Sequence, residues 1–136
     1  MSILLIFPLH ETILTGNLNG QDGASTFHSS TLGSTGLSGE GFVARDICIQ
    51  DTAGRKKGQA VALRVSSDRA VFYLCRIDAN HDTLYAYKYQ QFYRECQITG
   101  TVDFICGDAT AVFQNCQIEG VDRLKDRAMQ EQLFVK

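Results

Sequence analysis

Two aspartates, Asp82 and Asp103, have the spacing in this sequence that most directly suggests chemistry. They lie 21 residues apart, and Gln59 precedes Asp82 by 23 residues. In a chain that coils with a similar number of residues per turn, the two carboxyl groups sit on adjacent turns, with backbones about 5 Å apart. Two such groups cannot both ionise cheaply in a partly dry site, so one pKa should rise. The pair can then supply a nucleophile and a proton donor, although two surface turn residues would show the same spacing.

The sequence around the second aspartate supports a functional role. Val102-Asp103-Phe104-Ile105 places a charge inside an apolar strand, which is costly without a partner or a role. Aromatic residues crowd the segment between the two aspartates, namely Tyr85, Tyr87, Tyr89, Phe92 and Tyr93. Aromatic rings beside carboxylates are common on sugar-binding surfaces and equally common in core packing. Both interpretations remain open at this point.

The elements that would position these residues form an internal repeat. One aligned column holds Ile49, Ile77, Ile98 and Ile118, at spacings of 28, 21 and 20 residues. A second column, two places earlier, holds Ile47, Cys75, Cys96 and Cys116. An aromatic residue also precedes each block, at Phe42, Phe72, Phe92 and Phe113.

Apolar and polar residues alternate within each block, as in strands with one buried face. Strands that recur without crossover helices can coil and stack their like residues into ladders. The repeat therefore predicts an all-β coil of parallel strands. A β-sandwich with accidental similarity is the alternative, whereas the leucine spacing and asparagine ladder of leucine-rich repeats are absent.

Composition limits the other classes of function. The length of 136 residues fits one domain, and a net charge of −2 gives no electrostatic footprint for nucleic acid. No apolar run approaches the roughly 20 residues of a membrane span. The stretch Ile3–Phe7 is expected to be a buried strand rather than a truncated leader, because it has no basic n-region or cleavage site. The five cysteines contain no C-x-x-C pair, which disfavours a zinc site.

Several segments closely resemble plant pectin methylesterases, in family order and with family-like gaps. They are Thr12-Ile13-Leu14-Thr15-Gly16, Gly41-Phe42-Val43-Ala44-Arg45-Asp46-Ile47, Thr52-Ala53-Gly54, Gln59-Ala60-Val61-Ala62-Leu63-Arg64-Val65, Asp82-Thr83-Leu84-Tyr85, Gln91-Phe92-Tyr93-Arg94 and Gly100-Thr101-Val102-Asp103-Phe104-Ile105. The resemblance implies a right-handed parallel β-helix, here partial and of about five turns. It also implies hydrolysis of the methyl esters of pectin, without a metal or an organic cofactor.

The resemblance assigns roles to individual residues. Asp103 matches the nucleophile, and Asp82 matches the proton donor that later acts as base. Gln59 matches an amide that binds substrate and stabilises the oxyanion, while His81 stands where the family has a second such glutamine. Thr26 matches a threonine that contacts substrate.

The resemblance also implies a location and partners. Cys48 and Cys75 match a family disulfide between neighbouring turns, in keeping with secretion to the cell wall. Cys116 matches a cysteine whose partner lies further along the family sequence. The expected partners are methylated homogalacturonan and, by family analogy, a proteinaceous pectinesterase inhibitor, with neither nucleic acid nor membrane.

The match breaks after Gly120, where the family continues and supplies an arginine and a tryptophan in a Gly-Arg-Pro-Trp motif. This chain has no tryptophan. We therefore expect a partial β-helix domain over 1–120 and a divergent tail over 121–136, with a short helix between Asp122 and Gln132. We also expect turns that the family has before Thr12 to be missing. A coil open at both ends exposes strand edges, and we expect it to fold marginally unless the ends are covered.

Three functions compete at this stage. The first is a pectin methylesterase, a carboxylic ester hydrolase that acts through the two aspartates. The second is a catalytically impaired remnant or a non-catalytic pectin-binding fragment of the same family. The third, another β-helical pectin enzyme such as a lyase or polygalacturonase, is disfavoured because Asp82-Thr83-Leu84-Tyr85 is an esterase feature.

Overall fold

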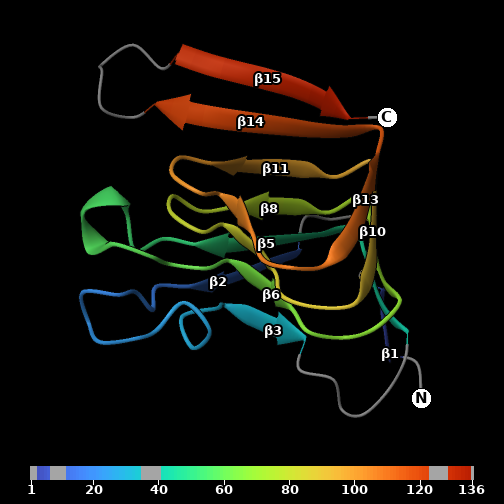
Figure 1. The fold of residues 1–136 in the computed structure, drawn as a ribbon, viewed down its shortest axis with the longest axis horizontal. Helices are drawn as coiled ribbons and strands as arrows, with labels where there is room; N and C mark the ends of the chain where they lie inside the picture. Colours follow the sequence, from blue (N-terminus) through green and yellow to red (C-terminus); the bar gives the residue numbers. More distant parts are fainter. Residues whose placement is uncertain (1–2, 7–11, 35–40, 123–128, 136) are drawn as a thin grey trace.

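The chain winds through three sheets that run side by side along a coil (Figure 1). The computed structural model describes residues 3–6, 12–34, 41–122 and 129–135. Sheet A contains β1 (Ile3–Ile6), β4 (Phe42–Arg45), β7 (Ala70–Tyr73), β10 (Gln90–Arg94) and β13 (Thr110–Gln114). Sheet B contains β2 (Thr12–Gly16), β5 (Ile47–Asp51), β8 (Arg76–Asp78), β11 (Gln97–Gly100), β14 (Cys116–Asp122) and β15 (Met129–Val135). Sheet C contains β3 (Leu32–Ser34), β6 (Leu63–Val65), β9 (Leu84–Ala86) and β12 (Ile105–Cys106).

Each turn of the coil contributes one strand to every sheet. β1, β2 and β3 form the first turn, and three further sets of three follow before β13 and β14 begin a fifth. Strands of adjacent turns pair in parallel, so the fold is a right-handed parallel β-helix, as expected. A short 3-10 helix, Arg55–Lys57, lies between β5 and β6. Among the described residues, no helix is long and apolar enough to cross a membrane.

The isoleucine column is confirmed by the strand register of sheet B. Ile49 pairs with Ile77, Ile77 with Ile98, and Ile98 with Ile118. All four side chains are buried, and Leu14 continues the ladder beneath Ile49. Figure 1 shows these strands stacked in order from β2 to β14. Burying one isoleucine of this kind contributes roughly 1.5–3 kcal/mol, so the ladder is a principal source of stability.

The second predicted column also lies in the core, and sheet A adds a ladder that contains three aromatic rings. Ile47, Cys75, Cys96 and Cys116 are each at most 2% exposed. In sheet A the register instead aligns Ala44, Phe72, Tyr93 and Phe113. Tyr93 stacks on Phe72 and on Phe113, with ring centroids 5.2 and 4.8 Å apart. Phe92 does not join this ladder, because β10 turns Gln91 and Tyr93 to the core and Phe92 to the outside.

The disulfide expected between Cys48 and Cys75 is not formed in this structure. The strand register explains why. Cys48 pairs with Arg76 rather than with Cys75. The Cys75 Sγ lies 3.6 Å from the Ala44 carbonyl oxygen and 3.4 Å from that of Tyr73. Cys75 therefore belongs to the inward thiol ladder with Cys96, which is buried at the equivalent position on the next turn.

Left-handed backbone makes the sharp corner between sheets A and B. From the second turn to the fifth, one non-glycine residue with positive φ lies between sheets A and B, at Asp46 (56°), Leu74 (54°), Glu95 (50°) and Asn115 (52°). The corners also pair with one another, since the Leu74 amide donates to the Arg94 carbonyl at 3.1 Å. Such residues cost energy in isolation and persist here because the stacked turns hold them.

The sequence predicted a strand near the N-terminal end and a helix near the C-terminal end, and the two predictions have different outcomes. The strand expected at the N-terminal end is confirmed for Ile3–Ile6, where β1 pairs with β4 in parallel, while Phe7 lies outside the described residues. The helix expected from Asp122 to Gln132 is absent from the described part of that range. Met129 to Gln132 belong to β15, which pairs antiparallel with β14, and residues 123–128 lie outside the described residues.

A glycine after β12 provides a test of how tightly adjacent turns pack. Gly107 has a φ of +113°, and a Cβ there would lie 2.0 Å from the Ala86 carbonyl oxygen on the preceding turn. Because that neighbour is backbone, Gly107→Ala should lower the free energy of unfolding by at least about 2 kcal/mol. Urea unfolding followed by circular dichroism measures this change.

Gly23→Ala is the matched control for this variant. Gly23 also has positive φ, at +91°, but nothing lies within 4 Å of an added Cβ. Gly23→Ala should therefore lower the free energy of unfolding by about 1 kcal/mol, which is the cost of the backbone conformation alone. If the two variants lose the same free energy of unfolding, the adjacent turns must move apart to make room for the methyl group at position 107.

Candidate active site

Asp82 and Asp103 occupy equivalent corners on adjacent turns of the coil. Asp82 lies between β8 and β9, and Asp103 lies between β11 and β12. The Asp82 amide donates to the Val102 carbonyl at 3.2 Å, and Leu84 pairs with Ile105 just beyond them. The proximity expected from the spacing of 21 residues is therefore confirmed.

Both aspartates adopt left-handed backbone, with φ of 59° at Asp82 and 46° at Asp103. Aspartate tolerates this region better than most residues, because its short side chain bonds locally. This conformation interrupts the in-and-out alternation of side chains at the same point in both turns. The two carboxyl groups therefore project from backbones of the same shape. The same conformation recurs at the corners between sheets A and B, so it is a regular feature of the coil that fixes where the two carboxyl groups lie.

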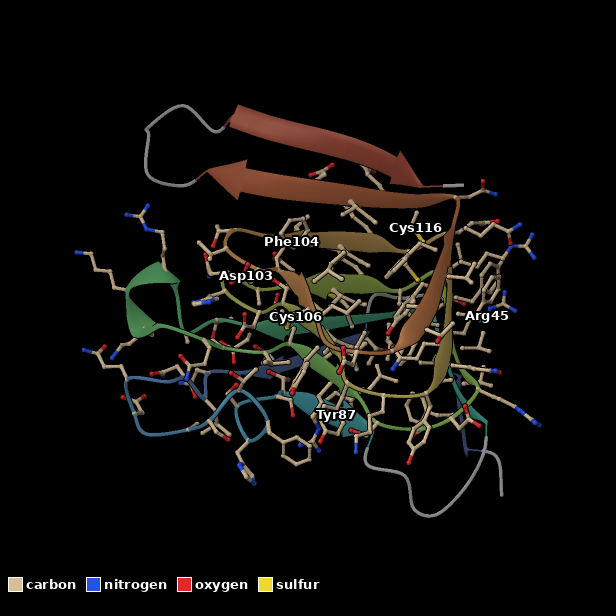
Figure 2. The ribbon with its side chains drawn as sticks, viewed as in Figure 1. Arg45, Tyr87, Asp103, Phe104, Cys106 and Cys116 are labelled. Carbon is tan, nitrogen blue, oxygen red and sulfur yellow. The ribbon has the colours of Figure 1, made fainter. Side chains whose placement is uncertain are left out.

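The environments of the two carboxyl groups differ. The Asp82 side chain is 12% exposed, whereas Asp103 is exposed. Thr26 Oγ1 donates to Asp82 Oδ2 at 3.4 Å, and His81 Nε2 lies 3.4 Å from Asp82 Oδ1. Figure 2 shows Asp103 at its turn with Phe104 and Cys106 nearby, away from Arg45.

Burial raises the pKa of Asp82 above its ordinary value, and the negative charge of Asp103 adds to this effect. The charge of His81 and the hydrogen bond from Thr26 act in the opposite direction, without reversing the shift. The sequence predicted a raised pKa from the like-charge pair. The direction is confirmed, but the larger cause is removal of the carboxyl group from water.

The other expected site residues surround this pair. Thr26 lies in the loop between β2 and β3 and reaches Asp82 across the fold. Gln59 lies one turn before Asp82, where the amide of the next residue, Ala60, donates to the His81 carbonyl at 3.1 Å. The Gln59 amide packs over Gly20, so closely that a Cβ on that glycine would overlap it. The glycine is therefore what leaves room for the Gln59 side chain.

Sequence reasoning missed a row of residues on the outer face of sheet C. The register aligns Gly33, Arg64, Tyr85 and Cys106 on successive turns. Burial raises the pKa of the Cys106 thiol to about 12, and the charges of Asp82 and Asp103 contribute. Cys106 therefore lies close enough to the acidic pair to sense its charge.

The aromatic residues between the two aspartates separate into core and surface. Tyr93 is fully buried, while Tyr89 is 56% exposed. Tyr85 and Tyr87 meet edge to face at 5.3 Å, and Phe27 packs against Tyr87 at 5.4 Å. This second group lies beside the acidic pair, so it is the part of the aromatic cluster that can contact a sugar.

One group of possible metal ligands occurs in the part of the chain that the structure describes. His81, Asp82 and Asp103 each offer one ligand atom, and these atoms all lie within 4.8 Å of one another. The same side chains form the acidic pair and its neighbour, so any ion bound there would contact the site directly.

Comparison with known proteins assigns the family. Residues 7–133 match the pectinesterase family, which covers most of the chain and extends into the segment after residue 120. The chain belongs to the pectinesterase family. Its sequence is 61% identical over 108 residues to probable pectinesterase 56 of Arabidopsis thaliana, covering 79% of this chain and 36% of that protein. It is 57% identical over 110 residues to pectinesterase 2.2 of Solanum lycopersicum, covering 81% and 20%.

Solved structures agree with the family assignment. Pectin methylesterase from carrot superposes with a TM-score of 0.77 at 51% identity, over 80% of this chain and 33% of the carrot chain. A pectin methylesterase solved in complex with a hexasaccharide gives a TM-score of 0.72 at 28% identity, over 93% and 45%. The chain thus spans about a fifth to a third of the curated pectinesterases named here.

Proposed function

We propose that this chain removes methyl esters from pectin, giving methanol and pectate. The observation that carries the proposal is the pair of unlike carboxyl groups on adjacent turns, Asp82 sheltered with a raised pKa and Asp103 open to solvent. A raised pKa keeps Asp82 protonated to higher pH, as a proton donor requires. An exposed carboxylate is accessible to an ester, as a nucleophile requires. Membership of the family supports the same division of roles.

The proposed reaction has two steps. A carboxylate oxygen of Asp103 attacks the ester carbonyl carbon, and the tetrahedral intermediate expels methoxide, which takes the proton of Asp82 and leaves as methanol. The product of this step is an acyl-enzyme on Asp103. Asp82, now ionised, removes a proton from water as the water attacks the acyl carbon. Cleavage of the bond to Asp103 then releases the galacturonic acid unit and restores both side chains.

Three neighbours support these steps in the proposal. The Thr26 hydroxyl holds one oxygen of Asp82 by the hydrogen bond described above, which directs the other oxygen toward the site. Gln59 and His81 are the proposed donors to the oxyanion of the tetrahedral intermediate, and Thr26 and Gln59 are the proposed contacts for substrate. Loss of one such donor typically costs about 10²–10³-fold in rate.

A second candidate function is a pectin-binding fragment with little or no catalysis. The packing of the Gln59 amide over Gly20 favours this candidate, because an amide held against Gly20 is less free to turn toward an oxyanion. Both candidates use the same surface beside Asp103.

The setting of either function follows from the family. We propose an extracellular, cell-wall location and methylated homogalacturonan as the partner. A proteinaceous inhibitor is a further proposed partner, because a relative from Prunus persica, 58% identical over 107 residues, is named pectinesterase/pectinesterase inhibitor.

Methanol release from highly methylated pectin tests the proposal. The purified chain should release methanol above a protein-free blank, and ester-free polygalacturonate should give none. If no methanol appears while the chain still co-sediments with pectin, the chain is a pectin-binding fragment and the proposed esterase function is wrong. If the chain neither binds nor hydrolyses pectin, both candidates fail for this chain.

A further inference from the structure

We propose that His81, Asp82 and Asp103 form a binding site for a divalent transition-metal ion of the zinc class, and that the bound ion blocks the esterase reaction. The blocking effect rests on the proposed function, whereas the binding site does not. The site takes one ligand from each of three side chains, two of them consecutive in the chain and the third on the next turn.

The distances suit a metal of this kind. Zinc binds imidazole nitrogen and carboxylate oxygen at about 2.0–2.2 Å, so neighbouring ligands of a tetrahedral site lie roughly 3.3–3.5 Å apart. His81 Nε2 and Asp82 Oδ1 are already 3.4 Å apart. The ligand atom of Asp103 lies within 4.8 Å of both, and its side chain is exposed and able to rotate inward. One small rotation therefore completes three of the four positions, and water can occupy the fourth.

The surroundings prepare Asp82 for this role. Thr26 donates to Oδ2, which leaves Oδ1 facing His81 as the free ligand oxygen. Hydrogen bonds of this type orient ligating carboxylates and raise metal affinity. The His81 side chain is 33% exposed, so an ion has a path into the site from solvent.

The ligand set distinguishes among metals. Imidazole together with carboxylates suits zinc, cobalt and nickel, while calcium and magnesium require more oxygen ligands than these residues offer. The imidazole is specific to chains with this substitution, because the resembled family has glutamine at the position of His81. A neutral amide in its place would leave two carboxylates and a far weaker site.

The consequence for the reaction follows directly. Coordination withdraws negative charge from Asp103, so this carboxylate becomes a much weaker nucleophile toward an ester. It also uses Oδ1 of Asp82, so the proton that methoxide must receive is displaced. The same three side chains cannot hold the ion and carry out the ester hydrolysis at once, and inhibition should be reversed by a chelator.

Cobalt titration tests the binding site without reference to activity. We expect the folded wild-type chain to bind one Co²⁺, with visible absorption bands of a nitrogen- and oxygen-ligated ion. His81→Gln should weaken binding at least about tenfold, since even loss of an outer hydrogen bond costs 10–100-fold. His28→Gln is the matched control, because His28 is exposed and bonds to Ser25 instead, and its Co²⁺ affinity should equal that of the wild type. Equal affinities for wild type and His81→Gln, or no Co²⁺ binding by either, would overturn the proposal.

Inhibition of methanol release by Zn²⁺ tests whether the bound ion blocks the esterase reaction. Zn²⁺ at saturating concentration should suppress wild-type methanol release at least tenfold relative to a chelated sample, and Mg²⁺ at the same concentration should not. Within His81→Gln, the ratio of rates with and without Zn²⁺ should stay near one. If the wild type releases no methanol at all, the proposed function and the blocking effect fail together, while the Co²⁺ titration still decides the site. Undiminished methanol release by a zinc-loaded wild type would overturn the blocking effect alone.

Discussion

Replacing Asp103 by alanine should lower methanol release from methylated pectin by on the order of 10⁴-fold or more. Asp103 provides the attacking oxygen in the proposed reaction, and within the described site Asp82 is the other carboxyl group close to it. Asp82 cannot substitute, because it is sheltered and holds the proton that methoxide needs. Release of methanol under initial-rate conditions, measured for both proteins at equal concentration, gives the ratio directly.

Asp108→Ala is the matched control for this experiment. Asp108 is an exposed aspartate in the turn after β12, and its backbone amide rather than its side chain bonds to the Tyr87 carbonyl. This variant should retain the wild-type rate, and circular dichroism should show the same β signal in all three proteins. A residual rate above one hundredth of wild type in Asp103→Ala would remove Asp103 from the role of nucleophile.

The second large effect concerns stability. Tyr93→Ala should lower the free energy of unfolding by roughly 3–5 kcal/mol, a large share of the stability of a small domain. Tyr93 is fully buried, and it lies between the rings of Phe72 and Phe113 on neighbouring turns. Its hydroxyl donates to Gln91 Oε1 at 2.6 Å, so truncation also leaves a buried acceptor unpaired. Urea unfolding followed by far-ultraviolet circular dichroism measures the change.

Two further variants separate the causes of this loss. Tyr93→Phe keeps the stacked ring and removes the hydroxyl, and should cost about 1–2 kcal/mol. Tyr89→Ala removes an equally large side chain that is 56% exposed, and should change stability by less than about 0.5 kcal/mol. A Tyr93→Ala protein as stable as the Tyr89→Ala protein would show that the ring stack does not hold adjacent turns together.

The repeat predicted the coil because inward ladders require like residues at matching positions. The column of Ile49, Ile77, Ile98 and Ile118 was read correctly for this reason. The phenylalanines that precede the blocks do not form a ladder of this kind, because Phe92 lies six residues before its isoleucine. A constant spacing of five residues before each isoleucine selects Tyr93 instead, and this spacing is fixed by the single left-handed corner residue between sheets A and B.

The candidate site was predictable in position but not in detail. A spacing of 21 residues was enough to bring Asp82 beside Asp103, because stacking turns sequence distance into proximity. Burial of Asp82 and the contact with Thr26 depend on how a loop from a distant turn folds over the corner. No local pattern encodes that contact. The expected disulfide failed for a related reason, since a one-residue difference in register directs Cys75 away from Cys48.

The antiparallel strand at the end of sheet B bears on how the chain acquires its structure. β14 and β15 pair across seven residue positions and are separated by six residues of sequence, whereas the parallel pairs described here join strands at least 20 residues apart. Closing a short hairpin takes on the order of microseconds, and longer closures are slower because more chain entropy must be lost first. We therefore expect this hairpin to be the earliest ordered segment and to act as a template on which the preceding turns are laid down in succession. Rapid-mixing hydrogen exchange would then show protection spreading from the C-terminal strands toward the N-terminal ones.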